Sequence, residues 1–329
     1  GAQPEEVLLR VAVTEPPTTR FAGVLGVSGR DARVTGLLDL DLANIAGTAR
    51  RASARWEDRG EGLSRFGLSY LEPWLPLLPI GLEGGLTHDV NEGVYSYTKW
   101  EVAGSLDRSG GWRFRVGRGG TRAVETGSGL GAVTEGFTLV GVAWDRRNSM
   151  LLPTAGGRLA VETRRGTKRF TAAGDSLDQR VDRTRWTAQA EGYRRAGSRW
   201  LLALRASFEA LESPEDTLAR YDLFAVGGAS SLRGYREEQF LTRAAWIAQA
   251  EWRWLVDARG SALYLFADAG FVAPRAGREL RDSFDQFLLG TGVGLRQAGK
   301  LGLLGIEYGV AKGESPLDGR IHLRLDAVF

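Results

Sequence analysis

Apolar and polar residues alternate at every second position in several segments of this chain, for example 200–209, 246–254 and 321–329. A period of two is that of a β-strand, because successive side chains point to opposite faces. A strand of about ten residues with one apolar and one polar face is typical of a transmembrane β-barrel, whose outer face meets lipid. The alternation therefore predicts an all-β fold, a transmembrane antiparallel β-barrel.

The alternation divides the chain into sixteen predicted strands. They start near residues 21, 33, 48, 62, 80, 94, 111, 136, 156, 182, 199, 245, 261, 284, 301 and 319. Connections after even-numbered strands are mostly short, such as 107–110, whereas those after odd-numbered strands include the long polar segments 118–135 and 164–180. Bacterial barrels have their short turns in the periplasm. We therefore expect segment 226–240 to be extracellular and both chain ends to be periplasmic.

Composition excludes several other classes of protein. No run of about 20 apolar residues occurs, so the sequence predicts no membrane-spanning helix. The chain lacks cysteine, which excludes disulfides and zinc–thiolate sites. Its 45 glycines and 10 tryptophans are typical of turn-rich strands with interfacial aromatic girdles. Because the net charge is only +3 and the cations are scattered, we expect no nucleic-acid partner.

Segment 226–240, VGGASSLRGYREEQF, carries Arg233, Gly234 and Tyr235 between two predicted strands. An arginine presents a planar fork of donors that suits a carboxylate. If the segment folds into the lumen, a guanidinium shielded from water needs an ionic partner. Glu251 and Asp268 lie on the polar faces of later strands and are the predicted partners. The alternative is that Arg233 is a solvated loop residue.

The SLRGY sequence around Arg233 resembles the RGY motif of the outer-membrane assembly and secretion barrels, the superfamily that includes BamA, TamA and the two-partner secretion transporters. The resemblance extends to a glycine-rich first strand, to the segment 144–156 and to the FADAG sequence around Asp268. The superfamily also includes the bacterial surface antigen domains. The resemblance implies that the RGY loop folds into the lumen and that Arg233 pairs with Asp268. The implied role of that pair is architectural, or gating.

Segment 144–156, WDRRNSMLLPTAG, resembles the family's periplasmic turn after the eighth strand. Its motif residues are Trp144, Asp145, Pro153 and Gly156. Asp145 could pair with Arg147, Pro153 would end the strand ladder, and Gly156 would permit a tight turn. This copy departs from the family pattern at two positions, where it has asparagine and methionine. We interpret the segment as structural.

The first predicted strand contains Gly23 and Gly26, and the last ends in Phe329. Glycine weakens a strand, so the seam between the first and last strands would be the weakest junction of the wall. In related insertases this seam opens sideways and templates incoming strands. The alternative is that the glycines merely permit curvature. Phe329 resembles the terminal targeting signal of barrel proteins, although an amphipathic edge strand could also simply end the chain.

Residues 1–18 and 19–329 form the two predicted regions. Alternating apolar residues within 5–15 resemble the last strand of a periplasmic POTRA module, so we expect 1–18 to be its remnant. Residues 19–329 form the barrel. The first residues, GAQPEEV, lack the basic start and apolar core of a signal peptide, so we expect a mature or truncated chain.

The resemblance implies a protein of the bacterial outer membrane that inserts or assembles polypeptides through a gate between its first and last strands. Secretion through the lumen, or a passive pore or surface antigen, are alternatives. The expected partners are the lipid bilayer, unfolded outer-membrane or secreted polypeptides and periplasmic accessory proteins. We expect no cofactor and no catalytic activity. The two histidines, His88 in a loop-like context and His322, show no metal-ligand spacing, but an outer-membrane phospholipase is the enzyme alternative.

Overall fold

The structure is a computed structural model of the 329-residue chain. It describes residues 18–28, 33–60, 62–76, 78–126, 130–150, 152–172, 179–216, 218–257, 260–273, 284, 286–299 and 302–326. The predicted POTRA strand within 5–15 lies outside these residues, and of the predicted remnant 1–18 only Thr18 is described. Phe329 also lies outside the described residues.

Sixteen strands form one antiparallel sheet, as the alternation predicts. They are β1 (Thr19–Ser28), β2 (Arg33–Ile45), β3 (Arg50–Gly60), β4 (Leu63–Glu72), β5 (Gly81–Asn91), β6 (Tyr95–Arg108), β7 (Trp112–Glu125), β8 (Leu130–Asp145), β9 (Gly156–Ala172), β10 (Gln179–Ala196), β11 (Trp200–Glu212), β14 (Ala244–Leu255), β15 (Ala262–Val272), β16 (Gln286–Gly299), β17 (Gly302–Ala311) and β18 (Arg320–Asp326). The largest error in the predicted starts is at β8, which begins at Leu130 rather than near 136.

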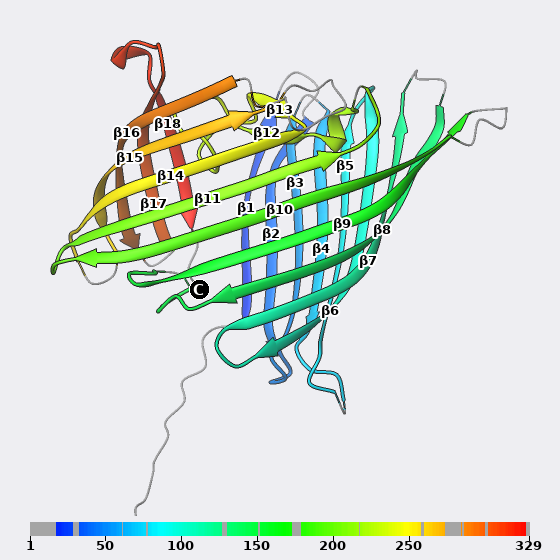
Figure 1. Ribbon diagram of the computed structural model, residues 1–329, viewed down its shortest axis with the longest axis horizontal. Coiled ribbons are helices and arrows are strands. Elements are labelled where there is room, and N and C mark those ends of the chain that lie inside the picture. Colours follow the sequence, from blue (N-terminus) through cyan, green and yellow to red (C-terminus); the bar gives the residue numbers. More distant parts are fainter. Residues whose placement is uncertain are drawn as a thin grey trace, which may run out of the picture.

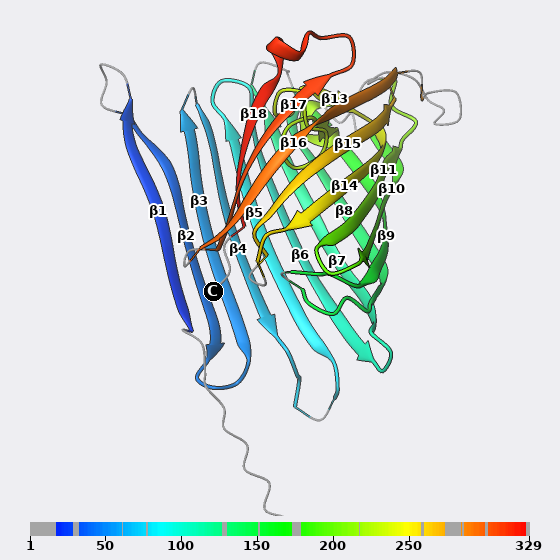
Figure 2. The ribbon, with the colours of Figure 1, turned by 90° about the vertical axis from the view of Figure 1, so that its left-hand side faces the viewer.

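Each strand of this sheet pairs with its neighbours in chain order, and β1 and β18 are the two ends of that order. Figure 2 shows the sheet curved round, with β1 in blue and β18 in red on the side that faces the viewer. The pairings of the described residues include none between these two strands. Within β1, Gly23 lies opposite Leu38 and Gly26 opposite Thr35 on β2.

The two faces of the wall differ in burial. In β15, Tyr264, Phe266 and Asp268 are buried, whereas Leu263 and Leu265 are exposed. Exposed leucine, valine and tryptophan side chains recur on the outer face of neighbouring strands, where lipid would cover them. The buried face is the lumenal one. The described residues include no long apolar helix that could cross a membrane.

Two local predictions are wrong. Segments 118–135 and 164–180, expected to be long loops, are mostly strand, because β7 continues to Glu125 and β9 to Ala172. Their arginines and threonines still alternate across the two faces of the sheet. A polar composition is therefore not sufficient to predict a loop. His88, expected in a loop, lies within β5, where its Nδ1 is 2.8 Å from Thr98 Oγ1 on β6.

The connection between β11 and β14, residues 213–243, folds against the inside of the wall. We call it the lumenal loop. It contains the short 3-10 helix η1 (Arg220–Asp222) and the two-stranded hairpin β12 (Phe224–Val226) and β13 (Phe240–Thr242). Figure 1 shows this hairpin at the upper end of the barrel. A second 3-10 helix, η2 (Pro316–Asp318), lies between β17 and β18.

Apolar packing fixes the lumenal loop to the wall. Val226, Leu232 and Tyr235 are buried in one cluster that includes Ile247 of β14 and Leu288 of β16. A second cluster joins Leu218, Leu223 and Phe224 of the loop with Leu211 of β11. These contacts hold the loop in place, and its polar side chains then meet lumenal side chains of the strands.

Candidate functional site: the buried arginine of the lumenal loop

Arg233 lies at the centre of the first polar cluster. Only 1% of its surface is exposed. Its Nε donates to Asp268 Oδ2 at 2.7 Å and its Nη2 to Asp268 Oδ1 at 2.7 Å. The backbone N–H of Arg233 also donates to Asp268 Oδ2, at 3.0 Å. This two-pronged pairing fixes both the side chain and the backbone of the loop to β15.

Two further carboxylates complete the shell around Arg233. Its Nη1 donates to Glu251 Oε1 of β14 at 2.8 Å and to Glu307 Oε1 of β17 at 3.0 Å. Its guanidinium carbon lies 3.8 Å from the centre of the Phe266 ring. We call Arg233, Asp268, Glu251 and Glu307 the Arg233 cluster. Burial alone would lower the pKa of Arg233, but its hydrogen bonds and the charges of the three carboxylates raise it above its ordinary value.

Gly234 permits close contact between the loop and the wall. Its φ is +93°, and an added Cβ would lie 2.9 Å from the carbonyl carbon of Val310 and 3.0 Å from the nitrogen of Ala311. Its N–H donates to His322 Nε2 of β18 at 3.1 Å. Arg320 Nη1 donates to the carbonyl oxygen of Gly234 at 2.5 Å. No other residue type fits this position without strain.

Tyr235 continues the contact toward β16. Its hydroxyl donates to the carbonyl oxygen of Leu289 at 3.3 Å and accepts from the Leu289 N–H at 3.2 Å. Its ring packs edge-on against Phe240, with centroids 5.4 Å apart. The three motif residues therefore contact β14, β15, β16, β17 and β18, the last five strands of the sheet.

The structure places both predicted partners, Asp268 and Glu251, against Arg233. Sequence reasoning missed Glu307 and the contact of His322. Glu307 also accepts a hydrogen bond from Tyr264 Oη at 2.6 Å. Glu307 alternates with the apolar Ile306 in β17, and that alternation is the signal that could have placed its carboxylate in the lumen.

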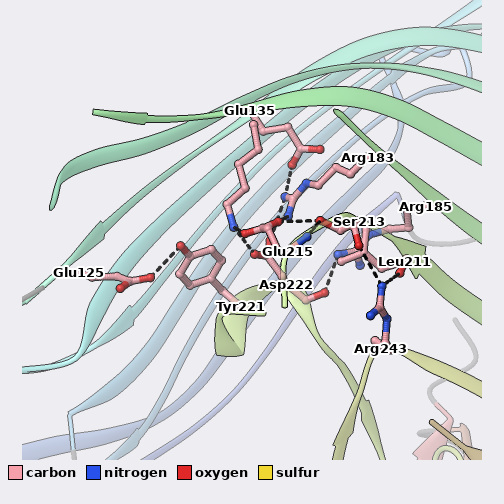
Figure 3. A network of polar contacts seen from close by, with 11 residues as sticks. Glu125, Glu135, Arg183, Arg185, Leu211, Ser213, Glu215, Tyr221, Asp222 and Arg243 are labelled. Atoms are coloured by element: carbon pink, nitrogen blue, oxygen red, sulfur yellow. Dashed lines mark hydrogen bonds and ion pairs between the residues drawn. The ribbon is translucent and has the colours of Figure 1, made fainter. Parts of the chain in front are cut away.

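A second polar cluster, which no sequence motif indicates, lies further along the wall (Figure 3). Asp222 Oδ2 accepts from Lys168 Nζ at 2.7 Å, and its Oδ1 lies 2.8 Å from Arg183 Nη2. Lys168 also donates to Glu215 Oε1 at 2.9 Å. Arg183 forms a further ion pair with Glu135 of β8. We call these five residues the Asp222 cluster.

Neighbouring contacts hold η1 in this position. Arg185 Nη2 donates to the carbonyl oxygen of Asp222 at 2.8 Å, and Tyr221 Oη donates to Glu125 Oε1 of β7 at 2.8 Å. Burial raises the pKa of Tyr221, and so does its hydrogen bond to Glu125. Burial would raise the pKa of Asp222, but Arg183 and Lys168 together lower it below its ordinary value. The lumenal loop is thus tied to two separate parts of the wall.

The predicted turn motif begins inside a strand. Trp144 and Asp145 are the last residues of β8, and Arg147 Nη2 donates to Asp145 Oδ2 at 2.6 Å. Pro153 is buried. Gly156 begins β9 with φ at +90°, and an added Cβ would overlap the carbonyl oxygen of Arg146.

Asn148, one of the two departures from the family pattern, closes the turn. Its Oδ1 accepts from the N–H of Thr154 at 2.9 Å, and its Nδ2 donates to Thr154 Oγ1 at 2.9 Å. The departure is therefore accommodated by local hydrogen bonds. Among the described residues, no group of three or more His, Asp or Glu side chains is arranged to hold a metal ion.

A family model described as the Omp85 superfamily domain matches residues 122–326, more than half of the chain. This chain belongs to the Omp85 superfamily. The match includes the whole lumenal loop and both polar clusters. The Omp85 chain is a β-barrel of the bacterial outer membrane.

Two solved structures are similar to this Omp85 barrel. The crystal structure of BamA from Haemophilus ducreyi lacking POTRA domains 1-3 matches with a TM-score of 0.66 and 15% identity, over 94% of this chain and 69% of that one. CdiB from Acinetobacter baumannii matches with a TM-score of 0.59 and 15% identity, over 94% of this chain and 59% of that one. At 15% sequence identity, these two matches show a similar fold and nothing more. Among curated protein sequences, none matches this chain.

Proposed function

We propose that this barrel inserts or assembles polypeptides in the outer membrane through a gate between β1 and β18. The Omp85 family and the BamA-like and CdiB-like fold support insertion or secretion of polypeptides in general. The observation that favours the gate is the attachment of Gly234 to the last strand, through His322 Nε2 at 3.1 Å and Arg320 Nη1 at 2.5 Å.

This attachment couples the lumenal loop to one edge of the proposed gate. The Arg233 cluster holds the loop against β14, β15 and β17, and the Gly234 contacts extend that hold to β18. The last strands then move as one unit with the loop, so opening at the other edge, the glycine-containing β1, needs the fewest contacts to break. The clients would be unfolded polypeptides that pair with the freed edge.

The alternative is secretion of a polypeptide through the lumen. The inner wall away from the loop favours it, since a cavity of about 430 Å³ there is lined by charged side chains that include Lys99, Glu101 and Arg115. Passage would require the lumenal loop to leave, and both the Arg233 and the Asp222 clusters would have to break. A passive pore is a third candidate with no observation of its own in its favour.

The proposal assigns the chain a transport function and no catalysis. It also includes residues 1–18 as the end of a periplasmic POTRA module that, with accessory proteins, would deliver clients to the gate. The seam residues Gly23, Gly26 and Phe329 belong to the gate in this proposal, and Trp144, Asp145, Pro153 and Gly156 to a structural turn.

A crosslinking experiment separates the gate from the lumenal route. Because the chain has no cysteine, pairs can be introduced with one member on β1 and one on β18. The full-length protein is reconstituted in liposomes, and the folding rate of an unfolded barrel protein is measured. We expect acceleration that disappears when the disulfide forms and returns after reduction.

The control is a cysteine pair at Val140 and Thr163, which lie opposite each other on β8 and β9, away from the seam. This disulfide should leave the acceleration intact. Acceleration that persists with the β1–β18 disulfide closed would contradict the gate and favour the lumenal route.

A further inference from the structure

The outer face of β7, β8 and β9 changes character along its length. Toward the periplasmic turns it is apolar, with Val116, Val140 and Val161 exposed. Toward the end that carries the lumenal loop it becomes basic. Four exposed arginines lie there, which we call the arginine patch: Arg118, Arg122, Arg165 and Arg169.

Strand register brings the four arginines together. Arg118 of β7 and Arg165 of β9 lie on either side of Thr138 of β8. Four residues further along each strand, Arg122 and Arg169 lie on either side of Thr134. Because neighbouring strands are about 4.8 Å apart, the patch concentrates four cations in one small area.

These arginines differ from the cations on the inner face of β9 and β10. Lys168 and Arg183 are buried and paired with Asp222. In the part of the chain that the structure describes, no carboxylate forms an ion pair with any of the four patch arginines. Their donors point outward and are available to a ligand.

A hollow lies between the two arginine pairs. Its row contains Gly120 of β7 and Gly136 of β8, and a Cβ on Gly136 would meet no atom within 4 Å. The indole of Trp100 on β6 lies over Gly120, where its Nε1 is 2.8 Å from the position of an added Cβ. A cavity of about 640 Å³ is lined by three of the arginines and by the threonines of this region.

Two acidic residues border this cavity, Glu135 and Asp182. Glu135 is already paired with Arg183. Asp182 of β10 lies opposite Thr167 of β9, and Thr167 Oγ1 donates to Asp182 Oδ1 at 2.6 Å. The Thr167 hydroxyl therefore bonds to one Asp182 carboxylate oxygen. Because Glu135 is paired with Arg183, the four arginines of the patch face one exposed acid, Asp182. The balance of charge in the hollow is positive.

We infer that the arginine patch binds the phosphate-bearing headgroup of a membrane lipid. Guanidinium forks and hydroxyl donors suit phosphate oxygens, often in bidentate pairs. The apolar rows around Val116 and Val140 continue directly from the patch, so acyl chains attached to the headgroup would lie along them. Trp100 belongs at the same level, because tryptophan is enriched at membrane interfaces.

The position of the patch supports a lipid over a soluble anion. Arginine is unfavourable on the lipid face at the bilayer centre and tolerated near the interface, so this row marks the interfacial level. The patch lies at the end of the barrel that carries the lumenal loop, which corresponds to the outer leaflet. This inference does not depend on how the barrel moves polypeptides.

The test is lipid binding to the purified barrel in phosphatidylcholine nanodiscs, measured by native mass spectrometry. The probe is bisphosphorylated lipid A, compared with the same lipid after removal of its phosphates. We expect the variant R118Q/R165Q/R169Q to bind lipid A about tenfold more weakly than the parent protein. The matched control R194Q/R195Q/R199Q changes three exposed arginines at the periplasmic end of β10 and in the turn that follows it, and should bind as the parent does.

Resistance to unfolding in cold detergent shows which variants are folded. If the triple glutamine variant does not fold, Gly136→Trp fills the hollow without removing any arginine and should weaken lipid A binding similarly. Equal binding by the patch and control variants, or equal binding of the phosphate-free lipid, would overturn the inference. Displacement of lipid A by equimolar inorganic phosphate would overturn the assignment to a lipid headgroup.

Discussion

Arg233 and Asp268 are joined by two parallel side-chain hydrogen bonds of 2.7 Å each, and the Arg233 N–H donates to the same carboxylate. Both residues are almost completely buried. Removal of Arg233 leaves the buried Asp268 carboxylate without this counter-charge, and breaking a buried pair in this way costs about 3–5 kcal/mol in proteins. Removal of Asp268 leaves Arg233 with Glu251 and Glu307 but without its bidentate partner. The stability of the folded loop therefore depends on this pair.

The first prediction concerns Arg233. We expect Arg233→Ala to lower the free energy of unfolding by about 3–5 kcal/mol. Arg233→Lys should lower the free energy of unfolding by less than Arg233→Ala does, because an ammonium keeps the charge but cannot form the bidentate pair. Urea titration of the protein in liposomes measures both. Arg236→Ala removes an exposed arginine of the same loop and should change little, so equal losses at positions 233 and 236 would contradict the importance of the pair.

Glu307 offers a graded comparison. It makes one hydrogen bond to Arg233, at 3.0 Å, whereas Asp268 makes three. We expect Glu307→Gln to destabilise the barrel by less than Asp268→Asn does in the same titration. The reverse order would show that the contact of Glu307 with Tyr264 matters more than its contact with Arg233.

Gly234→Ala tests the close approach of loop and wall. An alanine at φ +93° costs about 1–2 kcal/mol in strain, and the overlap with the backbone of β17 adds about 1–3 kcal/mol. Gly313 has a similar φ of +87° but no atom within 4 Å of an added Cβ. Gly313→Ala should therefore show the strain alone, and the difference between the two variants measures the overlap. A difference near zero would remove the steric role of Gly234.

The Asp222 cluster should contribute independently of the Arg233 cluster. Asp222→Asn leaves Lys168 and Arg183 without that charge and should cost about 3–5 kcal/mol. In the double variant with Arg233→Ala, the two losses should add within about 0.5 kcal/mol, because the clusters share no side chain. Unfolding free energies of the four proteins form the cycle. Strong non-additivity would mean that the loop detaches as one unit once either cluster breaks.

Acid should weaken the Asp222 cluster in a predictable direction. The pKa of Asp222 is lowered in the folded protein relative to its ordinary value of 3.8. The stability that its ionised form contributes is therefore present above that value and is lost as pH falls through the folded pKa. Unfolding free energies at about pH 5 and about pH 2.5 should differ more in the parent than in Asp222→Asn. Equal pH dependence in the two proteins would exclude this contribution.

The barrel and its strand count follow from local pattern. Each strand of segments such as 200–209 carries its own alternation, and antiparallel neighbours joined by short turns leave little freedom in the order of pairing. The Arg233–Asp268 contact could also be predicted from the sequence, because a buried guanidinium needs a carboxylate and both residues lie in recognisable motifs. Segment 118–135 was harder to predict as strand, because its outward-facing positions carry arginine and threonine in place of apolar residues and so resemble those of a loop.

Tertiary structure alone decided the Asp222 cluster, the arginine patch and the pairing of Glu307 with Arg233. Lys168 and Asp222 are 54 residues apart and stand in no motif, and their pairing depends on where the lumenal loop folds across the wall. The four patch arginines come together because strand register aligns β7 with β9 across β8. Alternation determines which face a side chain takes, but only pairing and loop packing determine which side chains meet, because these contacts join residues that are distant in sequence.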